Sequence, residues 1–439
     1  MKSKPLCLVT APVATRSGYG AHSRDIVRSL VRLDKYDIKI YPVRWGNTPQ
    51  NALNSQDPND TPIIERLLST PNMDRQPDIH IHIVIPNEFQ TLGKYNIGIT
   101  AGIETTACPP LWVEGMNRVD LNIVPSNFTK EVLEKVTYEK EDSGVKLGTL
   151  KLEKPMEVLF EGCDTNIYKP TKDFTVELHK EISIIPEKFV FLYVGHWLQG
   201  GLGKDRKDTG MLVKTFLETF KNKLKTPALI LKSSGATFSV IDREEMLGKI
   251  EEIKKTVVGR LPNVYLLHGD LTDEEMNELY NHPKVKVHVS FTKGEGFGRP
   301  LLEASLSGKP VIASDWSGHT DFLDKKLAVM LPGELVDVDL SAFPENIYTK
   351  GSQWFQVNYG YASKVLKDIF KNYKQYLKKS KKLGEQNCKQ FSLEGMTNKF
   401  GEILDKYVPE FPKEVQLQLP KLKKVGDSKG LKLPKLKKV

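Results

Sequence analysis

Cysteine is scarce in this sequence of 439 residues, and its four cysteines show no spacing typical of a bound metal or a disulfide framework. Cys7, Cys108, Cys163 and Cys388 lie far apart, and no two of them form a Cys-x-x-Cys pair. This pattern favours neither a zinc site nor a network of disulfides. We therefore expect no metal ligands, and we expect the reducing cytoplasm as the location of the chain.

Long hydrophobic runs are also missing. No stretch approaches the roughly 18 apolar residues of a membrane span, and the apolar run near the N-terminus is too short for a secretion signal. Hydrophobic residues make up 39% of the chain and charged residues 27%, which is typical of a globular protein. The length exceeds that of one ordinary core, so we expect two domains.

Negative charge is sparse at the C-terminal end. The formal net charge is +9, but the segment 411–439 holds nine lysines against Glu414 and Asp427, which leaves the rest of the chain at +2. This segment repeats the sequence LPKLKKV and has no sustained apolar stripe, so we predict a disordered basic tail. A docking peptide, an acidic or nucleic-acid contact and an inert tail are all compatible with it.

The body alternates short β-rich runs with helical patterns, which predicts an α/β architecture with parallel sheets. The alternation restarts after Pro170, so we predict two tandem Rossmann-like, doubly wound domains that face a central cleft. The expected boundaries are 1–170 for the first domain and 171–390 for the second. The helical pattern at 391–410 is expected to pack back on the first domain.

The stretch FTKGEGFGRPLLEASLSG, from residue 291, places two acids around a glycine-rich turn. The glycines leave backbone N–H groups bare in front of a helix that begins near Pro300, and such a helix start favours a bound anion such as a diphosphate. Glu295 precedes the turn, and Glu303 falls on the first turns of the helix. One acid lies before the helix and the other inside it. This arrangement favours binding of successive parts of a long ligand, and it is less typical of the two acids of a hydrolase, which face each other across one bond.

The arrangement E-G-F-G-x4-E followed by G-K-P-V-I-A-S resembles the group 1 glycosyltransferases, family 4 of the glycosyltransferases, which have the two-domain GT-B fold. The resemblance implies that Glu295 contacts hydroxyls of the donor sugar and that Glu303 holds the ribose of the nucleotide. Backbone N–H groups from Gly296 through Phe297 to Gly298 would cover the sugar and phosphates, and Leu302 would lie on the same donor side.

Other segments resemble the same family in the expected order. The resemblance places Arg206 and Lys207 against the donor diphosphate, although an insertion, LQGGLGKD, and His196 depart from the family pattern. The loop RSGYGAHS resembles the glycine loop of the first domain. Its Gly18, Tyr19, Gly20 and His22 become donor-side candidates, as does Lys232 at the end of a strand.

Two further features have a simpler structural interpretation. His80 and His82 alternate on one side of a strand, where histidines are more often packed than functional; we keep His82, with Glu104, as an acceptor-side candidate. Asp337 and Asp339 mimic a metal-binding pair but are expected to be surface residues, and no metal is inferred.

The resemblance implies a retaining, hexosyltransferase-like enzyme that moves a sugar from a UDP-, GDP- or ADP-sugar to an acceptor hydroxyl, with no other cofactor. Two alternatives are an inactive sugar-nucleotide or glycan-binding module recruited by its tail, and a nucleic-acid base glycosyltransferase. Loops around Thr48, Phe89 and Cys108 are expected to shape the acceptor pocket. The segment WGNTPQNAL and the repeated tail resemble glycosyltransferases of tailed phages, which suggests glycan, protein or DNA as the acceptor.

Overall fold

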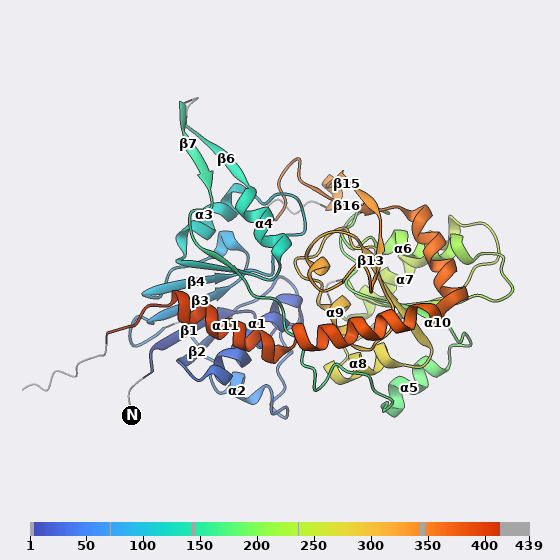
Figure 1. Cartoon of the computed structure of the whole chain (residues 1–439), viewed down its shortest axis with the longest axis horizontal. Helices are drawn as coiled ribbons and strands as arrows, with labels where there is room; N and C mark the ends of the chain where they lie inside the picture. Colours follow the sequence, from blue (N-terminus) through green and yellow to red (C-terminus); the bar gives the residue numbers. More distant parts are fainter. Residues whose placement is uncertain (1–3, 71, 143–144, 236, 343–346, 413–439) are drawn as a thin grey trace, which may run out of the picture.

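The computed structural model describes residues 4–70, 72–142, 145–235, 237–342 and 347–412. The chain forms two lobes, and each is centred on a six-stranded parallel sheet with helices around it (Figure 1). The prediction of two tandem Rossmann-like domains is therefore confirmed.

The N-terminal sheet has the strand order β2-β1-β3-β4-β5-β8. Its strands are β1 (Leu6–Ala11), β2 (Asp37–Pro42), β3 (Ile79–Ile83), β4 (Tyr95–Ile99), β5 (Leu121–Val124) and β8 (Met156–Val158). Its helices are α1 (Gly18–Leu33), α2 (Thr61–Ile64), η1 (Pro86–Glu88), α3 (Pro110–Arg118) and α4 (Asn127–Lys135). Every residue of β1 and β3 is buried, as expected for strands that are covered on both faces.

The C-terminal sheet has the order β11-β10-β9-β12-β13-β14. Its strands are β9 (Val190–Val194), β10 (Ala228–Lys232), β11 (Val264–Leu267), β12 (Val285–Val289), β13 (Val311–Ser314) and β14 (Val329–Leu331). The surrounding helices are α5 (Val176–Ser183), α6 (Thr209–Phe220), α7 (Val240–Lys255), α8 (Asp273–Asn281), α9 (Arg299–Leu306), η2 (Gly318–Asp321) and η3 (Leu340–Ala342). Thr272 and Glu275 form a capping box at the start of α8.

Two antiparallel hairpins were not predicted from the sequence. One pairs β6 (Thr137–Asp142) with β7 (Val145–Lys151), and the other pairs β15 (Gly333–Asp337) with β16 (Gln353–Val357). Strands β6, β7 and β15 carry charged and polar residues or glycine among their apolar ones, so their sequences lack the signal that marked the central strands, although β16 buries Trp354, Phe355 and Val357. The second hairpin lies at the domain boundary, since Gln353 O accepts a hydrogen bond from the N–H of Thr106 at 2.8 Å.

The last two helices connect the lobes along one side of the molecule (Figure 1). Helix α10 (Tyr359–Gln390), with non-helical angles at Asn372, packs on α6 and α9 of the C-terminal domain. Helix α11 (Leu393–Tyr407) packs on α1 and contributes side chains such as Met396 and Phe400 to the core around β1. Most of the predicted basic tail, residues 413–439, lies outside the described residues.

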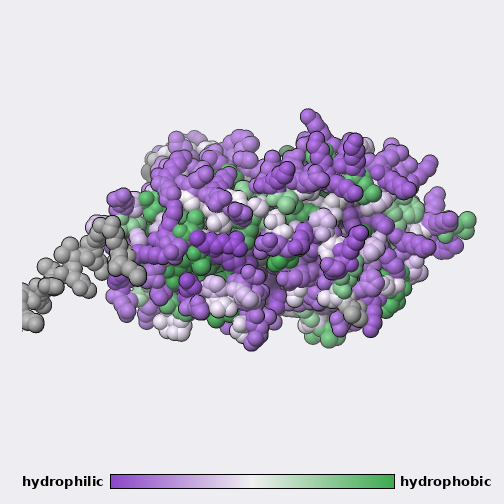
Figure 2. Space-filling model, turned by 60° about the horizontal axis from the view of Figure 1, so that its bottom comes forward, coloured by the Kyte–Doolittle hydropathy of each residue, from purple (hydrophilic) through white to green (hydrophobic). Residues whose placement is uncertain are grey.

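Within the described ranges, no helix combines the length and apolarity that crossing a membrane requires. The face drawn in Figure 2 is largely hydrophilic, and its hydrophobic residues form scattered patches.

Candidate active site

The segment that follows β12 forms a tight turn and then the first turn of α9. Gly298 has a φ of 96°, a left-handed conformation that glycine adopts without the strain caused by a Cβ atom. Arg299 and Pro300 begin α9, where proline fits because the first N–H groups have no partner inside the helix. The N–H of Glu295 donates to Ser317 Oγ at 3.0 Å, which fixes the turn against the loop after β13.

Glu295 is held between two cations. Lys207 Nζ lies 2.5 Å from Oε1, and Arg206 Nη1 lies 3.4 Å from Oε2. Burial alone would raise the pKa of the Glu295 carboxyl, but Lys207 and Arg206 outweigh burial and lower this pKa to about 2. Glu295 is therefore ionised and fixed in place at neutral pH.

The same cations touch the N-terminal domain. Arg206 Nη1 donates to Gly294 O at 2.8 Å and lies 3.5 Å from Glu104 Oε1. Burial raises the pKa of Glu104, and Arg206 counteracts this effect. The structure thus brings the three predicted catalytic residues, Glu295, Arg206 and Lys207, to one point at the domain boundary, together with Glu104. Their catalytic role stays a prediction.

The second acid of the motif, Glu303, has a partner on each oxygen. Arg299 Nε donates to Oε1 at 2.8 Å, and the Tyr280 hydroxyl donates to Oε2 at 3.1 Å. Burial raises the pKa of Glu303 to about 7, although Arg299 acts in the opposite direction. Glu303 therefore changes its charge near neutral pH, whereas Glu295 does not.

Arg299 also joins Glu303 to the N-terminal domain. Its Nη1 lies 2.5 Å from Asp25 Oδ2 on α1. Asp25 Oδ1 accepts from Arg28 at 3.1 Å, and Arg28 reaches Asp60 at 2.9 Å. A chain of alternating charges therefore runs from Glu303 across the domain boundary, and the side chain of Asp25 at its centre is only 5% exposed.

The glycine run lies against backbone of the N-terminal domain. A Cβ atom at Gly294 would lie 2.0 Å from Glu104 O, and one at Gly296 would lie 1.9 Å from Ala101 O. Gly296 O accepts from Ser126 Oγ at 2.6 Å. We expected these glycines to bare the turn toward a ligand; instead, their Cα atoms face the opposite domain, because only glycine permits so close an approach of two backbones.

This approach gives a prediction. Gly296→Ala is expected to lower the free energy of unfolding by about 1 to 3 kcal/mol, because the added methyl group has to push the domains apart. Gly248→Ala on α7 is the control, since a Cβ atom there meets no atom within 4 Å. Urea unfolding measures both variants. Equal stability of the two would contradict the close contact at Gly296.

The turn is buried at the domain boundary, and part of its backbone is unpaired. The N–H groups of Gly296, Phe297 and Gly298 have no hydrogen-bond acceptor among the described residues. On the other side of the boundary, α1 begins at Gly18, where a Cβ atom would meet no atom within 4 Å. The N-termini of α1 and α9, with unpaired N–H groups in the turn before α9, are suited to binding an anion.

The other residues of the first glycine loop have definite local contacts. Ser17 caps α1 by accepting from the N–H of Gly20, which packs so tightly on Thr15 that it has no room for a side chain. The Tyr19 hydroxyl lies 2.8 Å from Thr100 Oγ1. His22 is buried, and burial lowers its pKa to about 4, so its ring is neutral.

Three donor-side candidates use their side chains elsewhere. Phe297 and Leu302 lie in the apolar core of the C-terminal domain, so only their backbone can reach a ligand. Lys232 Nζ donates to Gly269 O at 2.6 Å and lies over the Phe238 ring. Leu302 is fully buried in this core, and its place among the donor contacts stays a prediction.

Comparison with known proteins agrees with this geometry. Residues 244–338, which include Glu295 and Glu303, match the family model "Glycosyl transferases group 1". The chain has the GT-B fold. A search of curated protein sequences found no significant match.

Solved structures of GT-B proteins superpose on nearly the whole chain. Sucrose-phosphate synthase from Thermosynechococcus elongatus has a TM-score of 0.61 at 12% identity, covering 92% of this chain and 98% of that one. HepE from Anabaena, solved with UDP-glucose, has a TM-score of 0.59 at 14% identity over 92% and 100% of the two chains. A glycosyltransferase from Rickettsia africae has a TM-score of 0.60 at 13% identity over 93% and 100%. At these identities the likeness establishes the fold.

The acceptor-side candidates of this GT-B protein lie apart from one another. His82 lines a cavity of about 620 Å³ in the N-terminal domain, together with Phe89 and Arg118. Burial lowers the pKa of His82 to about 3, and its Nδ1 accepts from the N–H of Gln90 at 3.1 Å. Glu104, in contrast, joins the cluster around Arg206.

The other acceptor-side loops contribute little to this cavity. His80 pairs with Thr10 Oγ1 at 2.9 Å, which agrees with a packed strand histidine. Thr48 Oγ1 donates to Trp45 O at 2.6 Å, and Cys108 is fully buried.

The acidic pair expected on the surface is partly engaged. Asp337 is exposed and accepts from Gln353 Nε2 at 2.9 Å, while Asp339 pairs with Lys204 at 3.0 Å. Among the described residues, no group of three or more His, Cys, Asp or Glu side chains is arranged to hold a metal ion.

Sequence reasoning missed several partners of the two acids. Tyr280 and Arg299 contact Glu303, and Asp25 contacts Arg299. Each of the three lies in a helix with an ordinary pattern of polar and apolar residues, so the local sequence does not mark it as functional. The one available signal was Arg299 itself, a charged residue inside the motif and the first residue of a mostly buried helix.

Proposed function

We propose that this protein transfers a sugar from a nucleoside diphosphate sugar to an acceptor hydroxyl, with retention of the anomeric configuration. The observation that carries the proposal is the bracketing of Glu295 by Lys207 and Arg206 beside unpaired N–H groups at Gly296 to Gly298. The group 1 match, which covers both acids, and the UDP-glucose complex of HepE support it.

The donor would lie along the domain boundary. Its pyrophosphate would occupy the space between the two cations and the N–H groups of the turn, with the N-terminus of α1 opposite. Glu303 would accept hydrogen bonds from ribose hydroxyls, and Glu295 from hydroxyls of the transferred sugar. Arg299 and Tyr280 orient Glu303 for this contact.

The reaction breaks the bond between the anomeric carbon and the phosphate oxygen. Negative charge develops on the leaving nucleoside diphosphate, and Arg206 and Lys207 stabilise that charge. The acceptor oxygen forms the new bond on the face that the phosphate leaves, and the proton of the acceptor hydroxyl passes to a phosphate oxygen. Glu295, ionised and paired, positions the sugar and does not attack it.

A screen of sugar nucleotides tests the donor site. One of UDP-, GDP- or ADP-glucose is expected to raise the melting temperature, since a ligand at about 100 times its Kd stabilises the native state by about 2.7 kcal/mol. The Lys207→Met variant is expected to show no rise in melting temperature with the donor. The Lys255→Met variant, changed at the exposed end of α7, is expected to show the same rise as the unaltered chain.

Two outcomes would contradict the proposal. Absence of stabilisation by all three donors removes the donor site. Binding without any release of nucleoside diphosphate, in the presence or absence of acceptors, favours the inactive binding module over the enzyme.

A further inference from the structure

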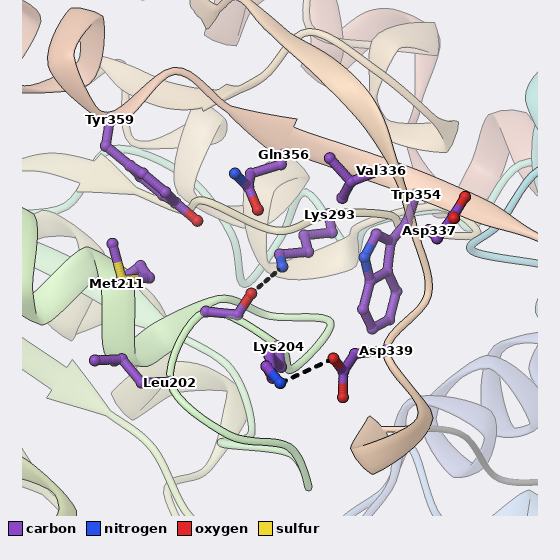
Figure 3. A pocket seen from close by; sticks show the side chains of 11 residues that line it. Leu202, Lys204, Met211, Lys293, Val336, Asp337, Asp339, Trp354, Gln356 and Tyr359 are labelled. Carbon is purple, nitrogen blue, oxygen red and sulfur yellow. Dashed lines mark hydrogen bonds and ion pairs between the residues drawn. The ribbon is translucent and has the colours of Figure 1, made fainter.

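A cavity of about 390 Å³ lies beside the candidate active site, between the insertion that departs from the family pattern and the β15–β16 hairpin (Figure 3). The insertion contributes Leu202, Gly203 and Lys204, and the hairpin region contributes Val336, Asp337, Asp339, Trp354 and Gln356. Lys293, Met211 and Tyr359 complete its walls. This volume falls within the range typical of small-molecule sites.

The charges of the cavity balance. Lys293 Nζ donates to Gly203 O at 2.5 Å and lies 5.2 Å from the centre of the Trp354 ring. Lys204 pairs with Asp339 at 3.0 Å, and Asp337 adds a second carboxylate. Two cations and two carboxylates give the lining no net charge, so it favours a neutral ligand over an anion.

Polar groups without partners face this space beside apolar ones. The Gln356 amide and the Trp354 indole N–H make no hydrogen bond to any described residue. Figure 3 shows Gln356 beside Lys293, with the nitrogen-bearing edge of Trp354 turned toward them. An aromatic ring and aliphatic side chains near unpaired donors and acceptors suit a sugar ring, which has apolar C–H faces and a rim of hydroxyls.

The cavity shares its two main loops with the candidate active site. Lys204 stands two residues before Arg206, and Lys293 stands two residues before Glu295. The N–H of Lys293 donates to Arg206 O at 2.7 Å, which joins these loops. A ligand in the cavity would therefore lie next to the cluster that holds the transferred sugar.

The cavity also lies at the domain boundary. Gln353 of the same hairpin exchanges two hydrogen bonds with Thr106 of the N-terminal domain, at 2.8 and 2.9 Å. An acceptor that enters between the domains would thus pass this hairpin.

We propose that the cavity binds a neutral sugar ring of the acceptor, held by Gln356, Trp354 and the Lys204–Asp339 pair. That this sugar ring belongs to the acceptor rests on the proposed function, whereas the binding of a sugar ring in the cavity does not. The insertion and the hairpin would then determine which acceptor glycan is used.

Saturation-transfer NMR on the full chain tests this site with three probes: methyl α-glucoside, maltose and N-acetylglucosamine. All three are expected to receive saturation from the protein. Gln356→Leu, which conserves volume, is expected to weaken binding roughly threefold to tenfold, the effect of one or two lost hydrogen bonds. Gln390→Leu, at an exposed position on α10, is the control and is expected to bind as the unaltered chain does.

The outcomes separate the two proposals. No saturation transfer to any probe, or equal binding by Gln356→Leu and the unaltered chain, overturns the sugar cavity. If Gln356→Leu fails to fold, Asp339→Asn, which removes the charge that pairs with Lys204, replaces it with the same expectation. Hydrolysis of sugar nucleotides by the unaltered chain is measured in parallel, and its absence counts against the proposed function alone.

Discussion

Replacing Glu295 with glutamine is expected to lower the rate of sugar transfer by roughly a hundredfold to a thousandfold, the range seen when one preorganised electrostatic contact is removed. The carboxylate is fixed by Lys207 at 2.5 Å and by Arg206 at 3.4 Å. Glutamine keeps the size of the side chain but removes the charge that orders both cations. Initial rates of nucleoside diphosphate release measure the effect.

Lys207→Met is the companion variant and is expected to show a loss of similar size, because it removes one of the two charges that meet the leaving pyrophosphate. Glu252→Gln on the exposed face of α7 is the matched control, and it should transfer sugar at the unaltered rate. Circular dichroism confirms that each variant is folded. Full activity in both Glu295→Gln and Lys207→Met would show that the reaction occurs elsewhere.

The residues of this cluster were assigned through the family resemblance, and the rules of parallel sheets explain why they meet. Glu295 follows β12, and Arg206 and Lys207 precede α6 after β9, a direct neighbour of β12 in the sheet. Carboxyl ends of neighbouring parallel strands meet at one edge, so residues 88 apart in sequence come together. The periodicity of the apolar residues was sufficient to place both strands.

The contacts across the domain boundary could not be predicted in the same way. The Arg299–Asp25 pair and the approach of Gly296 to Ala101 depend on how two complete domains meet, and no local pattern of residues encodes that orientation. The β15–β16 hairpin was missed for a related reason. Three of the five residues of β15, Gly333, Glu334 and Asp337, are exposed and are either polar or glycine. This strand is therefore defined by its pairing with β16 and not by burial.

The Arg299–Glu303 contact leads to the second large expected effect, on donor binding and its pH dependence. Arg299→Met is expected to raise the KM for the donor at least about tenfold at neutral pH, because removal of one partner from a buried ion pair is costly. Burial holds the pKa of Glu303 at about 7, and Arg299 is the main influence that lowers it. Without Arg299 this pKa rises further, and less of the ribose-binding carboxylate is ionised.

The pH profile gives the sign of this effect. For the unaltered chain, kcat/KM for the donor is expected to rise between about pH 6 and about pH 8 as Glu303 loses its proton. For Arg299→Met the rise moves to higher pH, whereas Arg299→Lys, which keeps the charge, retains the original midpoint with a smaller loss of affinity. Arg243→Met, at an exposed pair on α7, is expected to change neither quantity.

A second acid titrates in the same range and has to be separated from Glu303. Glu161 is buried, and burial raises its pKa to about 8, with Arg299 again acting in the opposite direction. Glu161→Gln is expected to leave the midpoint set by Glu303 in place, since Glu303 has Arg299 and Tyr280 as its hydrogen-bond partners in the described residues and not Glu161. Because Arg299 lowers the pKa of both acids, Glu161→Gln is the variant that distinguishes them. If Glu161→Gln removes or shifts the rise, the ionisation that controls donor binding belongs to Glu161, and the role given to Glu303 is wrong.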